Sequence, residues 1–179
     1  MKRRDFVALL GGAVAWPLVA RAQQVASVRR IGVLMSYSEN DAEAKAYLSG
    51  FTQGLQELGW TDGRNARIDV RWAAGSVDRM RVFAKELVDL QPHVILSNTT
   101  PVTAVLQRET RTIPIVFVVV SDPVGDGFVA SLARPGGNLT GFIFTEAEMG
   151  GKWLELLKEI APDIKRAAIM FNPDTASGR

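Results

Sequence analysis

The chain has 179 residues, of which 47% are hydrophobic and 22% are charged, a composition typical of a globular protein with a packed core. It contains no cysteine and a single histidine, which excludes disulfide bonds and argues against a zinc site. The formal net charge is +2, and the position of the charges along the chain decides what this value means.

Residues 1–22 have the pattern of an export signal. A basic start precedes an apolar run at 6–20, and the sequence ARA at 20–22 is a small-x-small cleavage site. The apolar run is shorter than the roughly 20 residues that span a bilayer. We therefore predict a signal that is cleaved after Ala22 and a mature chain that is delivered to the periplasm.

The signal also accounts for the basic charge. Its adjacent arginines resemble a twin-arginine signal, and an ordinary secretory leader is the alternative. Its charged residues are Lys2, Arg3, Arg4, Asp5 and Arg21. The remaining 157 residues carry 17 basic and 18 acidic side chains, a net charge of −1. The basic character of the whole chain is therefore no evidence for nucleic-acid binding.

Strand and helix patterns then alternate along the chain. Runs rich in Val and Ile predict buried strands, and apolar residues at helical spacing predict the helices between them. We expect strands at 30–36, 67–73, 93–97 and 113–120, and helices at 39–58, 76–88 and 101–109, the second capped by Ser76 or Asp78. The strand at 67–73 alternates polar and apolar residues, which places it near a sheet edge. Because parallel strands need crossovers, the predicted fold is α/β, a doubly wound parallel sheet with the flavodoxin-like strand order, covered on both faces.

Beyond Val120 the pattern loosens. Val129 and Leu132 indicate a short helix. Further elements are expected as a strand at 139–144, a helix at 153–160 and a strand at 166–171. The chain ends soon after that strand, where a crossover helix normally follows. We therefore expect one α/β lobe at residues 23–141 and a second lobe, begun at 142–179 and truncated.

Polar residues gather where three predicted strands end. They are Ser36 and Tyr37, Asn98, Thr99 and Thr100, and Ser121 and Asp122. Ligands of open parallel sheets bind beyond the carboxyl ends of the strands, so we predict a ligand-binding site there. Such residues also cap helices where nothing binds, and only their convergence supports a site.

The residue types suggest a zwitterionic ligand. Thr99 and Thr100 lead into Pro101 and a helix start, where free N–H groups and the helix dipole favour a carboxylate. Asp122 is the candidate partner of an ammonium group, and Tyr37 is the candidate for stacking on an apolar or aromatic side chain. The predicted ligand is thus an amino-acid-like small molecule.

The sequence offers no candidate catalytic machinery. The stretch GDGFVA at 125–130 matches a dinucleotide-binding fingerprint, but it does not directly follow the first strand. His93 precedes its strand, which puts it at the opposite end of the sheet from the predicted site. We expect no enzyme activity, no cofactor and no metal.

Several segments together resemble one family. They are the leader at 1–24, RRIGVLMS, FTQGLQELGWTDGRNARIDVRWA, TTPVTAVLQRET and IPIVFVVVSDPVGDGFVASLARPGGNLTG. They are similar to ABC-transporter substrate-binding proteins of the tryptophan/tyrosine-binding type. The resemblance implies a two-lobed, periplasmic-binding-protein-like monomer that traps a small solute and delivers it to an ABC permease at the inner membrane. Two lobes need more than the 157 residues left after cleavage.

The resemblance also places two further features. The first crossing between lobes falls at 134–142, where Gly137 and Gly141 are hinge candidates, with an exposed turn as the alternative. Asn172 follows a predicted strand of the second lobe and is a candidate ligand contact. Two other functions stay open, a ligand-sensing receptor module and a non-functional truncated fragment that exposes apolar surface.

Overall fold

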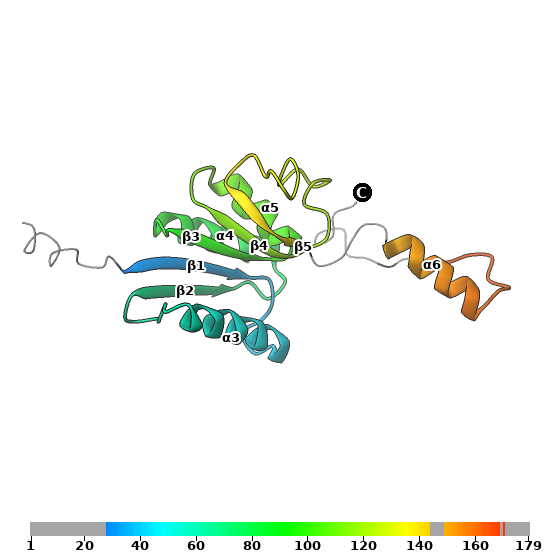
Figure 1. The fold of residues 1–179 in the computed structure, drawn as a ribbon, viewed down its shortest axis with the longest axis horizontal. Coiled ribbons are helices and arrows are strands. Elements are labelled where there is room, and N and C mark those ends of the chain that lie inside the picture. The colour runs from blue at the N-terminus through cyan, green and yellow to red at the C-terminus, as the bar shows by residue number, and fades with distance from the viewer. Residues whose placement is uncertain (1–27, 144–148, 169, 171–179) are drawn as a thin grey trace, which may run out of the picture.

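The computed structural model describes residues 28–143, 149–168 and 170. In chain order its elements are β1 (Arg29–Met35), α3 (Ala42–Glu57), β2 (Ala66–Trp72), α4 (Val77–Asp89), β3 (Val94–Asn98), α5 (Thr100–Glu109), β4 (Ile115–Val120), β5 (Leu139–Ile143) and α6 (Met149–Ile160). The strands form one parallel sheet in the order β2-β1-β3-β4-β5, the flavodoxin-like order (Figure 1). The predicted fold class is confirmed.

The helices begin where the sequence supplies a cap. The Asp41 carboxylate accepts a hydrogen bond from the backbone N–H of Ala44 at 3.0 Å, so α3 starts three residues later than its apolar pattern indicated. The Ser76 hydroxyl accepts from the N–H of Arg79 at 3.4 Å and caps α4, which confirms Ser76 over Asp78. Each cap satisfies an N–H group that has no partner within its helix.

Two helices cover one face of the sheet and one helix covers part of the other. α4 and α5 pack on β1, β3 and β4 through fully buried side chains that include Leu87, Leu106 and Phe117. On the opposite face α3 packs over β1 and β2, around Val33 and Met35. This arrangement is doubly wound, and it leaves the α3 face of β3 and β4 less covered.

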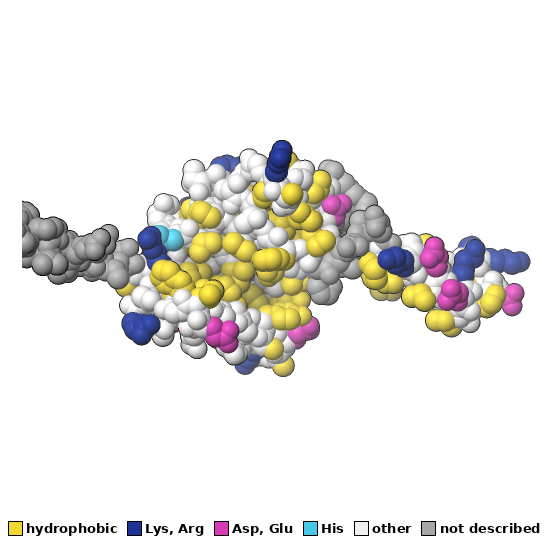
Figure 2. All heavy atoms as spheres, viewed as in Figure 1, with side chains coloured by type: hydrophobic (Ala, Val, Ile, Leu, Met, Phe, Trp, Pro, Cys, Tyr) yellow, Lys and Arg dark blue, Asp and Glu magenta, His cyan; other side chains and the backbone are white. Residues whose placement is uncertain are grey.

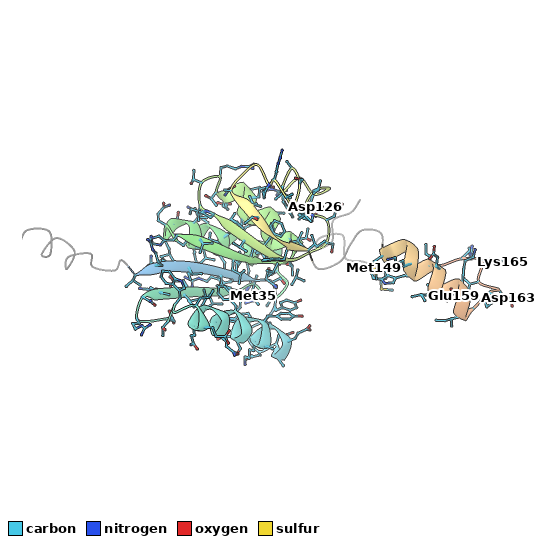
Figure 3. All side chains as sticks on the ribbon, viewed as in Figure 1. Met35, Asp126, Met149, Glu159, Asp163 and Lys165 are labelled. Atoms are coloured by element: carbon cyan, nitrogen blue, oxygen red, sulfur yellow. The ribbon has the colours of Figure 1, made fainter. Side chains whose placement is uncertain are left out.

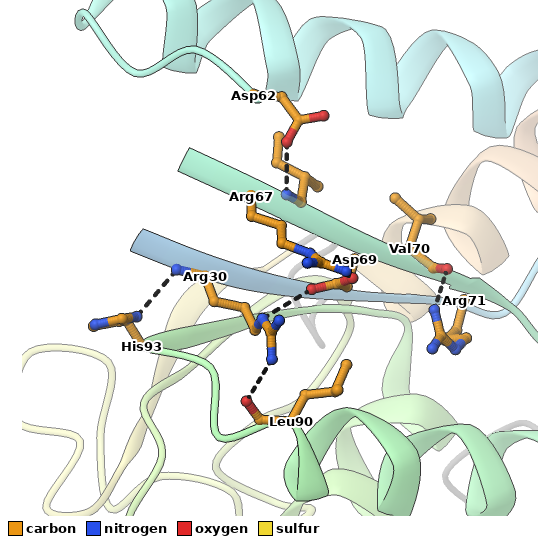
Figure 4. A network of polar contacts seen from close by, with 9 residues as sticks. Arg30, Asp62, Arg67, Asp69, Val70, Arg71, Leu90 and His93 are labelled. Atoms are coloured by element: carbon orange, nitrogen blue, oxygen red, sulfur yellow. Dashed lines mark hydrogen bonds and ion pairs between the residues drawn. The ribbon is translucent and has the colours of Figure 1, made fainter. Parts of the chain in front are cut away.

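The edge position of β2 is also confirmed, because β2 pairs only with β1. A polar network joins the two strands and reaches the start of β3 (Figure 4). The Asp69 carboxylate lies 3.2 Å from Arg30 Nε and 3.4 Å from Arg67 Nε. The Arg30 guanidinium donates to the Leu90 carbonyl at 3.0 Å, and His93 Nδ1 accepts from the Arg30 N–H at 3.1 Å. His93 therefore lies at the amino end of β3, as predicted.

Two predicted elements are wrong. Residues 128–132 form no helix; Phe128 and Val129 are instead buried in the core as part of an irregular loop. Residues 166–168 and 170 are not in a strand, because a strand needs a hydrogen-bonded neighbour and the described residues offer them none.

The position of β5 affects where the boundary between the two expected lobes can lie. The predicted strand at 139–144 forms, and it pairs in parallel with β4 as the fifth strand of the sheet. The boundary expected after residue 141 therefore falls within β5, and the division into lobes stays a prediction. The export signal predicted at 1–22 and Asn172 lie outside the described residues.

Candidate ligand-binding site

The ends of β1 and β3 come together as expected for neighbouring parallel strands. The Ser36 hydroxyl donates a hydrogen bond to Asn98 Oδ1 at 3.3 Å. Asn98 is only 1% exposed, and Ser36 and Tyr37 are half-buried. Three of the predicted ligand contacts thus lie at one edge of the sheet.

Thr99 has an unusual backbone. It is the N-cap of α5, with φ 82° and ψ 157°, a region that is occupied almost only by glycine. Its side chain makes no cap hydrogen bond, and its Oγ1 is buried without a hydrogen-bond partner among the described residues. Its N–H donates to the carbonyl of Val118 on β4 at 2.9 Å. A β-branched residue in this conformation costs about 1–3 kcal/mol, and such strain is concentrated at functional sites.

A second strained residue lies on the neighbouring strand. Val119 has φ 58°, and the pairing of β4 with β5 is irregular between Phe117 and Val120. Both Phe117 and Val120 are fully buried, so the core holds the residues on either side of Val119 in place. Asn98 of β3 pairs with Val118 of β4. The two strained residues, Thr99 and Val119, are the residues that directly follow this pair.

Asp122 has a local role that the sequence did not indicate. Its carboxylate accepts a hydrogen bond from the Gly125 N–H at 2.7 Å and closes the turn that follows β4. A Cβ at Gly125 would lie 2.1 Å from Asp122 Oδ2, so a side chain at this position would displace the carboxylate from its hydrogen bond. Gly125, the first glycine of the GDGFVA stretch, is therefore part of the turn that follows β4. Asp126 lies on the same loop (Figure 3). Ser121 is exposed beside Asp122, and Thr100 is half-buried as the first residue of α5.

Two tyrosines lie close to these strand ends. The rings of Tyr37 and Tyr47 have centroids 6.3 Å apart and are tilted by 58°. Burial raises the pKa of Tyr37, and the nearby carboxylates of Glu43 and Asp41 raise it further. The Tyr47 hydroxyl donates to the Glu43 carboxylate, and this hydrogen bond is the main cause that raises the pKa of Tyr47 to about 12.

An apolar hollow of about 250 Å³ adjoins the strand ends. It is lined by Met35, Tyr47, Leu48, Phe51, Leu96, Asn98, Val118 and Val119. Met35, the last residue of β1, lies at the hollow (Figure 3). Figure 2 shows hydrophobic side chains gathered next to α3, over the strands that α3 does not fully cover. Sequence reasoning missed the α3 residues of the lining, because their helical spacing is that of any core-facing helix.

The two hinge candidates differ in their surroundings. Gly141 lies in β5, where a Cβ would come within 2.0 Å of the Phe117 carbonyl oxygen. Gly137 lies in the preceding loop, and a Cβ there would meet nothing within 4 Å. The hinge role of both residues stays a prediction.

The described part of the chain has neither a metal-binding cluster nor a membrane-spanning helix. It contains no group of three or more His, Cys, Asp or Glu side chains that could hold a metal ion. No helix among the described residues has the length and apolar character that crossing a bilayer requires.

Comparison with known proteins identifies the family. The family model described as ABC transporter substrate binding protein matches residues 30–179. The chain belongs to this family. The resemblance stated from the sequence is therefore confirmed, and its relatives are substrate-binding proteins.

A curated protein and several solved structures are similar to this chain at comparable sequence identity. The chain is 31% identical over 130 residues to the tyrosine-binding protein of Clostridioides difficile (strain R20291), covering 73% of this chain and 37% of that protein. A conserved domain protein of Vibrio cholerae is 32% identical with a TM-score of 0.68, covering 78% of this chain and 46% of the other.

A third relative was solved with an amino acid bound. It is a Streptococcus pneumoniae protein in complex with L-Trp, 28% identical with a TM-score of 0.67, covering 78% of this chain and 45% of the other. The chain thus spans less than half the length of these relatives.

Proposed function

We propose that this chain provides the first lobe of the solute-binding component of an ABC importer, and that its strand-end site takes an amino acid with an apolar or aromatic side chain. The observation that carries the proposal is Thr99, a strained residue with a buried, unpartnered hydroxyl at the start of α5. Ser36 and Asn98 lie at the same edge of the sheet. A fold retains strain of this kind where it positions groups for a ligand.

The proposed mechanism is capture without chemistry. The ligand carboxylate binds at the amino end of α5, where the first N–H groups lack helical partners and the dipole favours an anion. Asp122 attracts the ammonium group, although one of its oxygens already accepts a bond from Gly125. Tyr37 offers its aromatic ring to the ligand side chain, and its raised pKa keeps the phenol neutral to a higher pH than that of an ordinary tyrosine.

The remaining steps belong to the whole protein. A second lobe closes over the ligand about a hinge that includes Gly137 and Gly141, with Asn172 as a contact from that side. The closed, monomeric form then docks on an inner-membrane permease in the periplasm, after export directed by residues 1–22. Family membership supports this sequence of events, and the names of the tyrosine-binding and L-Trp-bound relatives support the ligand class.

Isothermal titration calorimetry with the purified chain tests the ligand class. We expect L-tryptophan or L-tyrosine to bind, and tryptamine, which lacks the carboxylate, to bind at least about tenfold more weakly, a difference of 1.4 kcal/mol. Asn98→Ala should weaken binding, because it removes the acceptor of the Ser36 hydrogen bond. Gln53→Ala on the exposed side of α3 is the matched control and should leave binding unchanged. Absence of heat with both amino acids, or equal affinity for tryptamine, would contradict the proposal.

A further inference from the structure

A buried pair of hydroxyl groups lies directly beneath Thr99. Ser97 and Thr103 are both fully buried, and their Oγ and Oγ1 atoms are 2.6 Å apart. Thr103 Oγ1 also donates to the carbonyl oxygen of Thr99 at 2.9 Å. A hydroxyl has one proton to donate, so Thr103 accepts from Ser97 and passes its own hydrogen bond on to Thr99.

We propose that Ser97 and Thr103 are positioning residues that hold Thr99 in its strained conformation and thereby shape the ligand site; this inference rests on the function proposed above. The pair connects the end of β3 to the first turn of α5 across Thr99. No motif in the sequence distinguishes either hydroxyl from an ordinary core or helix residue.

The hydrogen bonds around Thr99 fix both of its peptide groups. Its carbonyl oxygen accepts from the Thr103 N–H at 3.1 Å, in addition to the Thr103 hydroxyl. Its N–H donates to the Val118 carbonyl at 2.9 Å. A backbone in a rarely occupied region persists only where the surroundings over-determine it, and these bonds from α5 and β4 do so.

The hydroxyl pair adds hydrogen bonds that an ordinary helix start lacks. The Thr103 N–H would still bond to the Thr99 carbonyl if the side chain were apolar, since this is the ordinary spacing of a helical hydrogen bond. The hydroxyl adds a second bond to the same oxygen and gives the buried Ser97 its partner. Removing the Thr103 hydroxyl leaves the buried Ser97 hydroxyl without this hydrogen-bond partner. It also removes one bond to the Thr99 carbonyl, so that Thr99 can relax toward an ordinary backbone conformation.

The test uses Thr103→Val, which keeps the side-chain shape, and Thr103→Ser, which keeps the hydroxyl. Thr110→Val is the matched control, because Thr110 is a buried threonine at the other end of α5 whose Oγ1 accepts from the N–H groups of Thr112 and Ile113. Two quantities are measured for each chain. They are the Kd for L-tryptophan and L-tyrosine by calorimetry, and the NMR coupling between the amide and α protons of Thr99, which reports its φ angle.

We expect Thr103→Val to weaken binding by about tenfold or more, equivalent to 1.4 kcal/mol, and to change the Thr99 coupling. Thr103→Ser should keep both near the wild-type values. Thr110→Val should lower stability against urea while leaving the Kd and the coupling unchanged. If Thr103→Val does not fold, Ser97→Ala takes its place with the same expected changes.

Two results would overturn the positioning role. One is an unchanged Thr99 coupling in Thr103→Val, and the other is an equal loss of affinity in Thr103→Val and Thr110→Val. If the wild-type chain binds neither amino acid, the proposed function fails, but the coupling still decides whether the hydroxyl pair holds Thr99. The two failures are therefore distinguishable.

Discussion

Tyr37 and Tyr47 illustrate how single residues take their properties from their surroundings. The chain has only these two tyrosines, and both have a raised pKa. Burial is the main cause for Tyr37, whereas Tyr47 is exposed and its hydrogen bond to Glu43 is the main cause. In both cases the neutral phenol is favoured, because a hydrogen bond to a carboxylate and the loss of water each penalise the phenolate.

The pH dependence follows from these causes. The folded-state pKa of Tyr47, about 12, lies above the ordinary value of 10.0, so its contribution to stability is complete below pH 10 and is lost as the pH rises toward 12. We expect a spectroscopic titration of the native chain to show phenolate forming only above pH 10. The urea-unfolded chain should titrate near 10.

Single substitutions show which tyrosine gives which part of the phenolate signal. Tyr47→Phe should remove the later part of the phenolate signal, and Tyr37→Phe should leave it. A native titration in which both phenols ionise at pH 10 would show that the hydrogen bond to Glu43 is absent in solution.

At the scale of elements, the glycine in β5 decides how closely the last strand approaches the sheet. Gly141 pairs with Phe117, and a side chain at Gly141 would collide with the Phe117 backbone. Because a backbone carbonyl cannot swing away as a long side chain can, the strand itself would have to move. Gly137 lies in the loop before β5, and a Cβ there would meet nothing within 4 Å.

The two glycines therefore make a matched pair of substitutions. We expect Gly141→Ala to lower the free energy of unfolding by about 1–3 kcal/mol, the usual cost of overpacking. Gly137→Ala should change it by less than about 0.5 kcal/mol. Urea denaturation monitored by circular dichroism measures both, and equal stabilities for the two variants would contradict the close approach of β5 to β4.

At the scale of the whole molecule, α6 stands apart from the sheet (Figure 1). None of its residues is buried, and its apolar side chains lie exposed at helical spacing. They are Trp153, Leu154, Leu156, Leu157 and Ile160. An amphipathic helix of this kind normally packs its apolar stripe against another element, and an exposed stripe binds hydrophobic molecules.

We expect the chain to bind a hydrophobic dye such as anilinonaphthalene sulfonate through this stripe. The double variant Trp153→Gln/Leu157→Gln should reduce dye fluorescence by about half or more, because it removes the centre of the stripe. Glu155→Gln, on the polar side of α6, is the control and should leave the fluorescence unchanged. Undiminished dye binding by the double variant would contradict this prediction and would mean that the dye binds elsewhere, as in the apolar hollow beside α3.

Part of the candidate site follows from the sequence. Polar residues after three strands predicted a common edge, and Ser36 and Asn98 do meet there because parallel strands end on the same side. The conformation of Thr99, the hydroxyl pair behind it and the apolar hollow beside α3 were not predicted. The Thr99 conformation and the hollow depend on contacts between segments far apart in the chain, which no local pattern encodes. The hydroxyl pair spans only six residues, but a serine and a threonine at this spacing are common in any strand and helix start.

The sequence by itself determined the type and order of the elements up to β4, the edge position of β2 and the Ser76 cap, because periodicity and capping are local properties. It also determined the family. Only the tertiary structure decided that residues 128–132 bury apolar side chains without a helix, that 166–168 form no strand, and that β5 joins the sheet. The physical reason is that strands and buried loops are stabilised by partners supplied from elsewhere in the fold.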